Sequence, residues 1–174
     1  MKRTTMFSAL ILLLMITSAG CNKIPKTAPL LSLSLSSGDS QEQRIQAIQL
    51  TTSWNYKTGG YEADSFHPLQ LDYDRFSKAT LHLINEVNEI KMAFSGNYPP
   101  HSVSVQRWNA ALLGDAHSFN EALDKGESVD VKGTTIYVPN DGYDYIYEVF
   151  ATWQNGSSYY TFCSEINVQG VTDS

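Results

Sequence analysis

The most restrictive feature of the sequence is a pair of β-rich segments joined by an Asn-Gly dipeptide near the C-terminus. Residues 143–154 read YDYIYEVFATWQ, Asn155-Gly156 follows, and residues 157–168 read SSYYTFCSEINV. Asn and Gly both tolerate positive φ, so the dipeptide predicts a two-residue type I′ turn and therefore a β-hairpin. A two-residue turn also determines which residues face each other across the two strands.

The predicted register gives this hairpin one apolar face. With Asn155-Gly156 as the turn, the expected pairs are Gln154 with Ser157, Ala151 with Tyr160, Val149 with Phe162 and Tyr145 with Ile166. Side chains alternate between the two faces of a strand, so the last three pairs share a face. The opposite face is expected to carry the pairs Glu148 with Cys163 and Thr152 with Tyr159, together with the apolar Ile146 and Phe150.

Similar patterns predict that residues 44–174 form one mainly-β domain. Further β-rich segments lie at residues 44–57, 89–94, 101–108, 129–131 and 135–139. Residues 71–83 fit either a helix or a strand, and residues 115–125 predict a short helix or a long crossing before Gly126. About seven strands with at most one or two short helices favour an antiparallel β-sandwich over βαβ units.

The order of these elements resembles an immunoglobulin-like domain over roughly residues 44–170. Trp108 stands on a middle strand, and Asp141-Gly142 precedes a strand that begins with Tyr143 and Tyr145. The chain has no cysteine pair to bridge two sheets, unlike antibody domains. The resemblance therefore implies an immunoglobulin-like β-sandwich architecture and no particular function.

The N-terminal segment, MKRTTMFSALILLLMITSAGC, has the pattern of an export signal. Lys2 and Arg3 precede a short apolar run, and small residues stand directly before Cys21. The run is shorter than the roughly 20 apolar residues of a spanning helix. The segment resembles the lipobox-type signal peptide of bacterial lipoproteins, and the alternative is an ordinary cleaved signal peptide. The resemblance implies cleavage after Gly20, acylation of the Cys21 thiol and a lipid anchor in the cell membrane, facing outside the cytoplasm.

Residues 21–43 are predicted to be the lipidated cysteine and a flexible tether. Prolines, Gly38 and a serine-rich run are typical of an unfolded spacer. Leu31, Leu33 and Leu35 alternate with serines, so an added edge strand is the alternative for that part. The expected organisation is a signal peptide over residues 1–20, this tether, and the β-sandwich over residues 44–174.

Charge and motifs argue against several function classes. The chain carries 12 Lys and Arg against 18 Asp and Glu, a net charge of −6, which disfavours a nucleic-acid partner. The common hydrolase, metalloprotease and nucleotide-binding motifs are absent from the sequence, so we predict a non-catalytic domain without a cofactor. An enzyme whose site joins residues distant in sequence is the alternative.

Metal and thiol chemistry are also not predicted. The four histidines, His67, His82, His101 and His117, lack metal-binding spacing. Asp72-Tyr73-Asp74 resembles a piece of a calcium loop but lacks the Gly and distal Glu of an EF-hand. With Cys21 assigned to lipid, Cys163 has no internal partner and is expected to be a half-buried apolar residue.

The candidate binding residues are aromatic side chains near two predicted turns. Trp54, Tyr56 and Tyr61 surround Gly59-Gly60, and Trp153 precedes Asn155-Gly156. Exposed rings at such positions stack on sugars or pack on protein partners, whereas the alternative is packing inside the core. The sequence thus predicts a membrane-anchored binding domain with a protein or glycan partner. A protease-inhibitor or regulatory module of the cell envelope and a carbohydrate-binding module are the alternatives.

Overall fold

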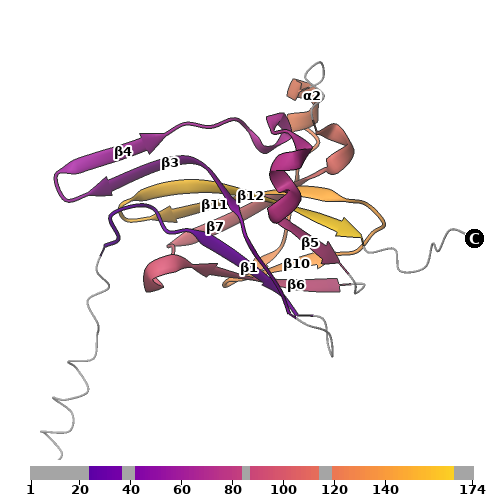
Figure 1. The fold of residues 1–174 in the computed structure, drawn as a ribbon, viewed down its shortest axis with the longest axis horizontal. Coiled ribbons are helices and arrows are strands. Elements are labelled where there is room, and N and C mark those ends of the chain that lie inside the picture. Colours follow the sequence, from indigo (N-terminus) through magenta and orange to yellow (C-terminus); the bar gives the residue numbers. More distant parts are fainter. Residues whose placement is uncertain (1–23, 37–41, 84–86, 114–118, 167–174) are drawn as a thin grey trace, which may run out of the picture.

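Two β-sheets pack face to face in the computed structural model, which describes residues 24–36, 42–83, 87–113 and 119–166 (Figure 1). The predicted mainly-β sandwich is confirmed. The described residues contain twelve strands, more than the predicted seven or so, because several predicted segments are divided and short edge strands are added. Short helices gather over one end of one sheet, at the upper right of Figure 1.

The smaller sheet has five antiparallel strands. Their order in space is β2-β1-β6-β10-β9. Their bounds are β1 Leu31–Leu35, β2 Gln43–Gln46, β6 Val87–Phe94, β9 Val131–Lys132 and β10 Thr135–Pro139.

The larger sheet has seven strands and contains the predicted C-terminal hairpin. Six of them follow the order β4-β3-β12-β11-β7-β8, and β5 pairs in parallel with the last part of β12. Their bounds are β3 Ile48–Tyr56, β4 Gly59–Ala63, β5 Thr80–Leu83, β7 Ser102–Asn109, β8 Glu127–Ser128, β11 Tyr145–Trp153 and β12 Gly156–Ile166. The described helices are η1 Pro68–Gln70, η2 Tyr73–Lys78, η3 Ser95–Asn97, η4 Ala110–Leu112 and α2 Phe119–Leu123.

The two ambiguous segments are now assigned. Residues 71–83 contain both predicted structures, the 3-10 helix η2 followed by strand β5. The predicted helix within residues 115–125 is confirmed as α2, while residues 115–118 lie outside the described part of the chain.

The predicted tether is wrong for residues 31–35. Strand β1 lies inside the five-stranded sheet, between β2 and β6, so it is not an edge strand either. Leu31, Leu33 and Leu35 are at most 1% exposed because the Leu-Ser alternation places every leucine on the inner face. The folded domain therefore begins before residue 44.

The C-terminal hairpin exists, but its predicted register is wrong by two residues. Trp153 pairs with Gly156, so the turn is Gln154-Asn155. Asn155 is not among the described non-glycine residues with positive φ, so the turn is not type I′. Tertiary contacts explain the shift: the Asn155 carbonyl accepts a 2.7 Å hydrogen bond from the Asn55 amide, and its side-chain oxygen accepts one from the Tyr98 hydroxyl.

The shift by two residues leaves the faces of the hairpin unchanged, because side chains alternate with a period of two. Tyr145, Val149 and Ala151 point into the core as predicted, now opposite Ser164, Tyr160 and Ser158. On the other face Glu148 pairs with Thr161, and Ile146 pairs with Cys163.

Gly156 has the positive φ that the sequence predicted, +149°, but the reason is close contact with β3. A Cβ atom at this position would lie 2.0 Å from the backbone oxygen of Ser53. Gly133 also has positive φ, +62°, yet a Cβ atom there would meet nothing within 4 Å. Substitutions at these two glycines therefore distinguish the cost of backbone strain from the cost of steric overlap.

We predict that Gly133→Ala lowers the free energy of unfolding by about 1–2 kcal/mol, the cost of left-handed backbone for a residue with a Cβ atom. Gly156→Ala should cost a further 1–3 kcal/mol or so, because β3 and β12 must separate to relieve the overlap. Urea unfolding of both variants measures the difference. Equal losses would show that β3 does not approach Gly156 as closely as the structure has it.

Candidate functional site

The two tryptophans predicted as binding residues lie in the core. Trp54 is 1% exposed and Trp153 is 6% exposed, and their rings meet edge to face with centroids 5.4 Å apart. Each indole N–H donates to a backbone carbonyl, that of Pro25 at 3.0 Å and that of Tyr98 at 2.9 Å. Both rings therefore pack inside the core, which is the alternative interpretation of the sequence. The predicted surface role is wrong for these two residues.

The two predicted tyrosines lie on the β3–β4 hairpin, which extends beyond the sandwich at the left of Figure 1. Tyr56 is half-buried beneath the ammonium group of Lys57, 5.3 Å from the ring centre. Tyr61 is 52% exposed on β4. Neither tyrosine lines any of the hollows described below, so the four predicted aromatics do not form one site.

A better candidate is a groove on the outer face of the seven-stranded sheet. We call it the outer-sheet groove, and its volume is about 300 Å³. It is lined by Leu50, Thr51, Ser65, Phe66, His67, Glu148 and Tyr159. These residues come from β3, β11, β12 and the segment that joins β4 to η1, so the groove exists only in the folded chain.

The outer-sheet groove lies where the helical cover of the sheet ends. Toward one end of this face, η1, η2 and α2 cover Trp108, Ile146 and Cys163 with their buried side chains. Beyond the cover, Phe150 and Tyr159 are only half-buried and stack on each other at 4.4 Å between ring centres. An aromatic pair is thus left facing solvent beside the groove.

Hydrogen bonds hold the segment that forms one wall of the groove. The Thr51 hydroxyl donates to Asp64 Oδ1 at 3.1 Å, and the Ser65 amide donates to the Thr51 hydroxyl at 3.2 Å. These bonds attach the segment to β3 and leave Phe66 69% exposed at the rim. The apolar ring of Phe66 is therefore presented to solvent by a fixed backbone.

Glu148 gives the groove its charge. This carboxyl group is half-buried on β11, and the loss of water contact raises its pKa from an ordinary value of 4.5 to about 7. Its sheet neighbours are Gln106 on β7 and Thr161 on β12, and the Thr161 hydroxyl donates instead to the Tyr147 carbonyl. Within the described residues, the carboxyl group of Glu148 has neither a hydrogen bond nor an ion pair.

His67 lines the groove, but its side chain is hydrogen-bonded to the backbone of η1. Its Nδ1 accepts a 3.2 Å hydrogen bond from the Leu69 amide, which caps η1, and its ring packs edge to face on Trp108 with centroids 4.9 Å apart. Burial lowers the pKa of the imidazole, which favours the neutral form. A neutral imidazole that accepts at Nδ1 carries its proton on Nε2, so it has no lone pair with which to activate a hydroxyl such as that of Ser65.

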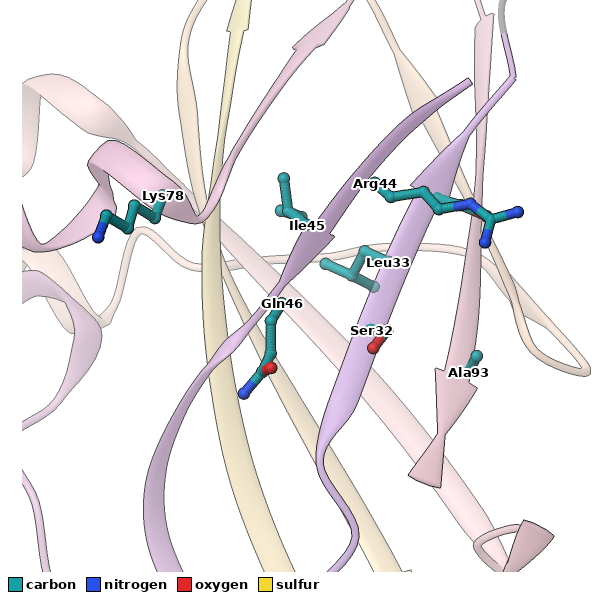
Figure 2. A pocket seen from close by; sticks show the side chains of 8 residues that line it. Ser32, Leu33, Arg44, Ile45, Gln46, Lys78 and Ala93 are labelled. Atoms are coloured by element: carbon teal, nitrogen blue, oxygen red, sulfur yellow. The ribbon is translucent and has the colours of Figure 1, made fainter. Parts of the chain in front are cut away.

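A second hollow of about 510 Å³ lies beside the edge strand β2 (Figure 2). Lys78 and Arg44 both line it, but Figure 2 shows their side chains pointing away from each other on opposite sides of the strand. Arg44 is also paired with Glu42 at 2.6 Å. The two cations do not converge, so this hollow does not form a single anion site.

A third cluster surrounds Arg107 at one end of the sandwich. The guanidinium lies 3.9 Å above the ring of Tyr145 and forms ion pairs with Glu127 at 2.9 Å and Asp141 at 3.1 Å. The Tyr145 hydroxyl donates to the same Asp141 at 2.8 Å. Because the guanidinium is already paired with two carboxylates, we assign this cluster a structural role.

Metal and thiol chemistry find no support in the described residues. They contain no group of three or more His, Cys, Asp and Glu that could hold a metal ion. Cys163 is fully buried and burial raises the pKa of its thiol to about 12, so the thiol is protonated at neutral pH. None of the described helices is long and apolar enough to cross a bilayer.

Comparison of the chain with protein-family models, with curated proteins and with solved structures gives no match. Similarity to known proteins therefore gives no information about the chemistry of the outer-sheet groove. The sequence offered one signal for it, a glutamate in the middle of a strand whose neighbours on the same face are Ile146 and Phe150. The other lining residues could not be associated with Glu148 without the fold.

The raised pKa of Glu148 makes the stability of the domain depend on pH. Between about pH 4.5 and 7, the folded state holds a proton that the unfolded chain releases, so this contribution to stability is lost as pH rises through the folded pKa. We predict that Glu148→Gln is more stable than the parent near pH 8 by about 1–2 kcal/mol, after allowance for screening by water, and equally stable near pH 4.

Urea unfolding at the two pH values measures this effect. Glu89→Gln is the matched control, since Glu89 is exposed on the other sheet and should change stability by less than about 0.5 kcal/mol. A Glu148→Gln variant with the parent's stability at both pH values would contradict the desolvation of this carboxyl group.

Proposed function

We propose that this chain is a membrane-anchored, extracytoplasmic lipoprotein whose β-sandwich binds a partner in the outer-sheet groove without catalysing a reaction. The observation that carries the proposal is the open half of the seven-stranded sheet, where a half-buried carboxyl group and aromatic rings line one groove. Sites of this kind combine a mostly apolar lining with a few polar groups that fix the orientation of the ligand.

The lipid anchor is supported by the sequence pattern before Cys21, with two basic residues, a short apolar run and small residues directly before the cysteine. An anchored domain needs a rigid surface that can meet a partner near the membrane. The groove offers this surface, because its wall is fixed to β3 by hydrogen bonds and its floor is the centre of the sheet.

The chemistry of the groove favours binding over catalysis. His67 is occupied as a helix cap, because its Nδ1 already accepts a hydrogen bond from the Leu69 amide. A general base must lie within hydrogen-bond reach of the proton that it removes. Glu148 is the one acidic group of the lining, which is suited to recognition of charge.

The anchor is tested by Cys21→Ser, which removes the acceptor of the lipid. We expect the parent to fractionate with membranes and the variant to be released, because two acyl chains contribute about 0.8 kcal/mol per buried methylene and serine receives none. Intact mass spectrometry of the membrane-extracted parent should show acyl mass on Cys21. A variant retained in membranes as firmly as the parent would contradict lipidation.

The binding surface is tested by placing a photoreactive phenylalanine analogue in the full chain in cells. We expect a cross-linked product when the analogue replaces Phe66 at the groove rim, and none when it replaces Tyr143, which is 59% exposed elsewhere. Adding Tyr159→Ala to the Phe66 variant should reduce the product about tenfold, as for loss of an aromatic hot spot. Equal products at both positions would contradict the groove as the binding site.

A further inference from the structure

We propose that the outer-sheet groove receives a lysine side chain from a protein partner, with the ammonium group at Glu148 and the methylene stem against Tyr159 and Phe66. This inference rests on the proposed binding function and names its occupant. Four properties of the groove lead to it: its charge, its lack of an internal cation, its size and the state of its hydroxyl groups.

The groove is negatively charged. Glu148 is the only acidic side chain among its lining residues, and neither Lys nor Arg belongs to the lining. His67 does not supply a compensating charge, because burial favours its neutral form. The whole chain has a net charge of −6, which adds a general attraction for cations.

Glu148 differs from three other glutamates of the described residues, whose carboxylates each have a partner. Glu42 pairs with Arg44 at 2.6 Å, Glu127 pairs with Arg107 at 2.9 Å, and Glu165 accepts a hydrogen bond from the Tyr73 hydroxyl. Those carboxylates already have a partner, whereas the half-buried Glu148 carboxyl group has none among the residues that the structure describes. An external cation would supply the missing interaction, since an opposite charge within a few ångströms favours the ionised form.

The size and lining of the groove fit a single long side chain. Its volume of about 300 Å³ is at the lower end of the range for ligand pockets, roughly 300–1,000 Å³. Leu50, Phe66 and Tyr159 offer apolar surface to the methylenes of a lysine, which places an apolar stem behind a charged head. An ammonium group also gains from nearby aromatic faces.

Two of the hydroxyl groups near Glu148 already have partners, which favours lysine over a neutral sugar or an arginine. Thr51 already uses its hydroxyl with Asp64 and the Ser65 amide, and Thr161 uses its own with the Tyr147 carbonyl. A sugar needs many hydrogen-bonding partners, and a guanidinium presents five donors in a fixed fork. A compact ammonium group beside one carboxylate needs fewer acceptors.

Binding should depend on pH through Glu148. The titratable groups that line the groove with it are His67 and Tyr159, and both are neutral near pH 7 because burial lowers the pKa of the imidazole and raises that of the phenol. Gln106 and Thr161, its neighbours on β7 and β12, do not titrate. Asp64 is the acidic residue of the wall segment, where it accepts from the Thr51 hydroxyl.

The test uses the full chain, purified in detergent, and a blocked pentapeptide, Gly-Gly-Lys-Gly-Gly, with Nε-acetyl-lysine and arginine versions as comparisons. We expect the lysine peptide to bind about tenfold more tightly than the acetylated peptide near pH 8, and the preference to disappear near pH 5, where Glu148 is protonated. Arginine should bind less tightly than lysine. Chemical-shift titration by NMR reports such weak affinities.

Two variants isolate the carboxylate. Glu148→Gln should abolish the preference for lysine at both pH values, and the control Glu89→Gln, on the other sheet, should keep it. The Glu148→Gln protein is expected to fold at least as stably as the parent, so loss of binding cannot be due to unfolding. Equal binding of the lysine and acetyl-lysine peptides, or a preference retained in Glu148→Gln, would overturn the proposal.

The cross-linking experiment at Phe66 distinguishes failure of the proposed binding function from failure of lysine as the occupant. Cross-linking without discrimination between the lysine and acetyl-lysine peptides would overturn lysine as the occupant and keep the groove as a binding site. A titration with N-acetylglucosamine oligomers then tests a glycan as the occupant, and their binding would also overturn the lysine proposal. Absence of cross-linking at Phe66 would instead contradict the proposed function itself.

Discussion

The interaction on which the rest of the structure depends is the aromatic cluster between the two sheets. Trp54, Trp153, Tyr98, Phe94 and Tyr160 form a chain of edge-to-face contacts with ring centres 5.4–6.1 Å apart. Such pairs add about 0.5–1.5 kcal/mol beyond the area that they bury. Because the rings come from both sheets, their packing determines how the sheets lie on each other.

The same cluster explains why the domain begins earlier than its composition indicates. A buried indole N–H or phenol hydroxyl needs an acceptor, and leaving one unsatisfied costs about 1–3 kcal/mol. Trp54 and Tyr160 donate to the carbonyls of Pro25 and Pro29, respectively. These bonds attach the segment before β1 to the core. Trp54 and Trp153 are both buried in this cluster, so the candidate binding site lies elsewhere.

The outer face of the larger sheet has the opposite character. Its helical cover ends before Glu148, so this carboxyl group stays half-buried and has no partner among the described residues. Its burial costs folding free energy at neutral pH. Natural proteins retain such groups at sites where function requires a charge in a poorly hydrated place. The groove therefore combines a cost in stability with the proposed capacity for recognition.

The sequence by itself determined the mainly-β class, the C-terminal hairpin and its faces, because alternation of side chains is local and survives a register error of two residues. The net charge also follows from the sequence alone, and the lipobox-type segment stays a prediction from it. Only the tertiary structure decided the register, since Asn155 and Gly156 respond to β3 and Tyr98, which are distant in the chain. It also decided which aromatics are buried and that Glu148 shares a groove with Phe66 and Tyr159, because burial depends on which surfaces the packed elements leave open.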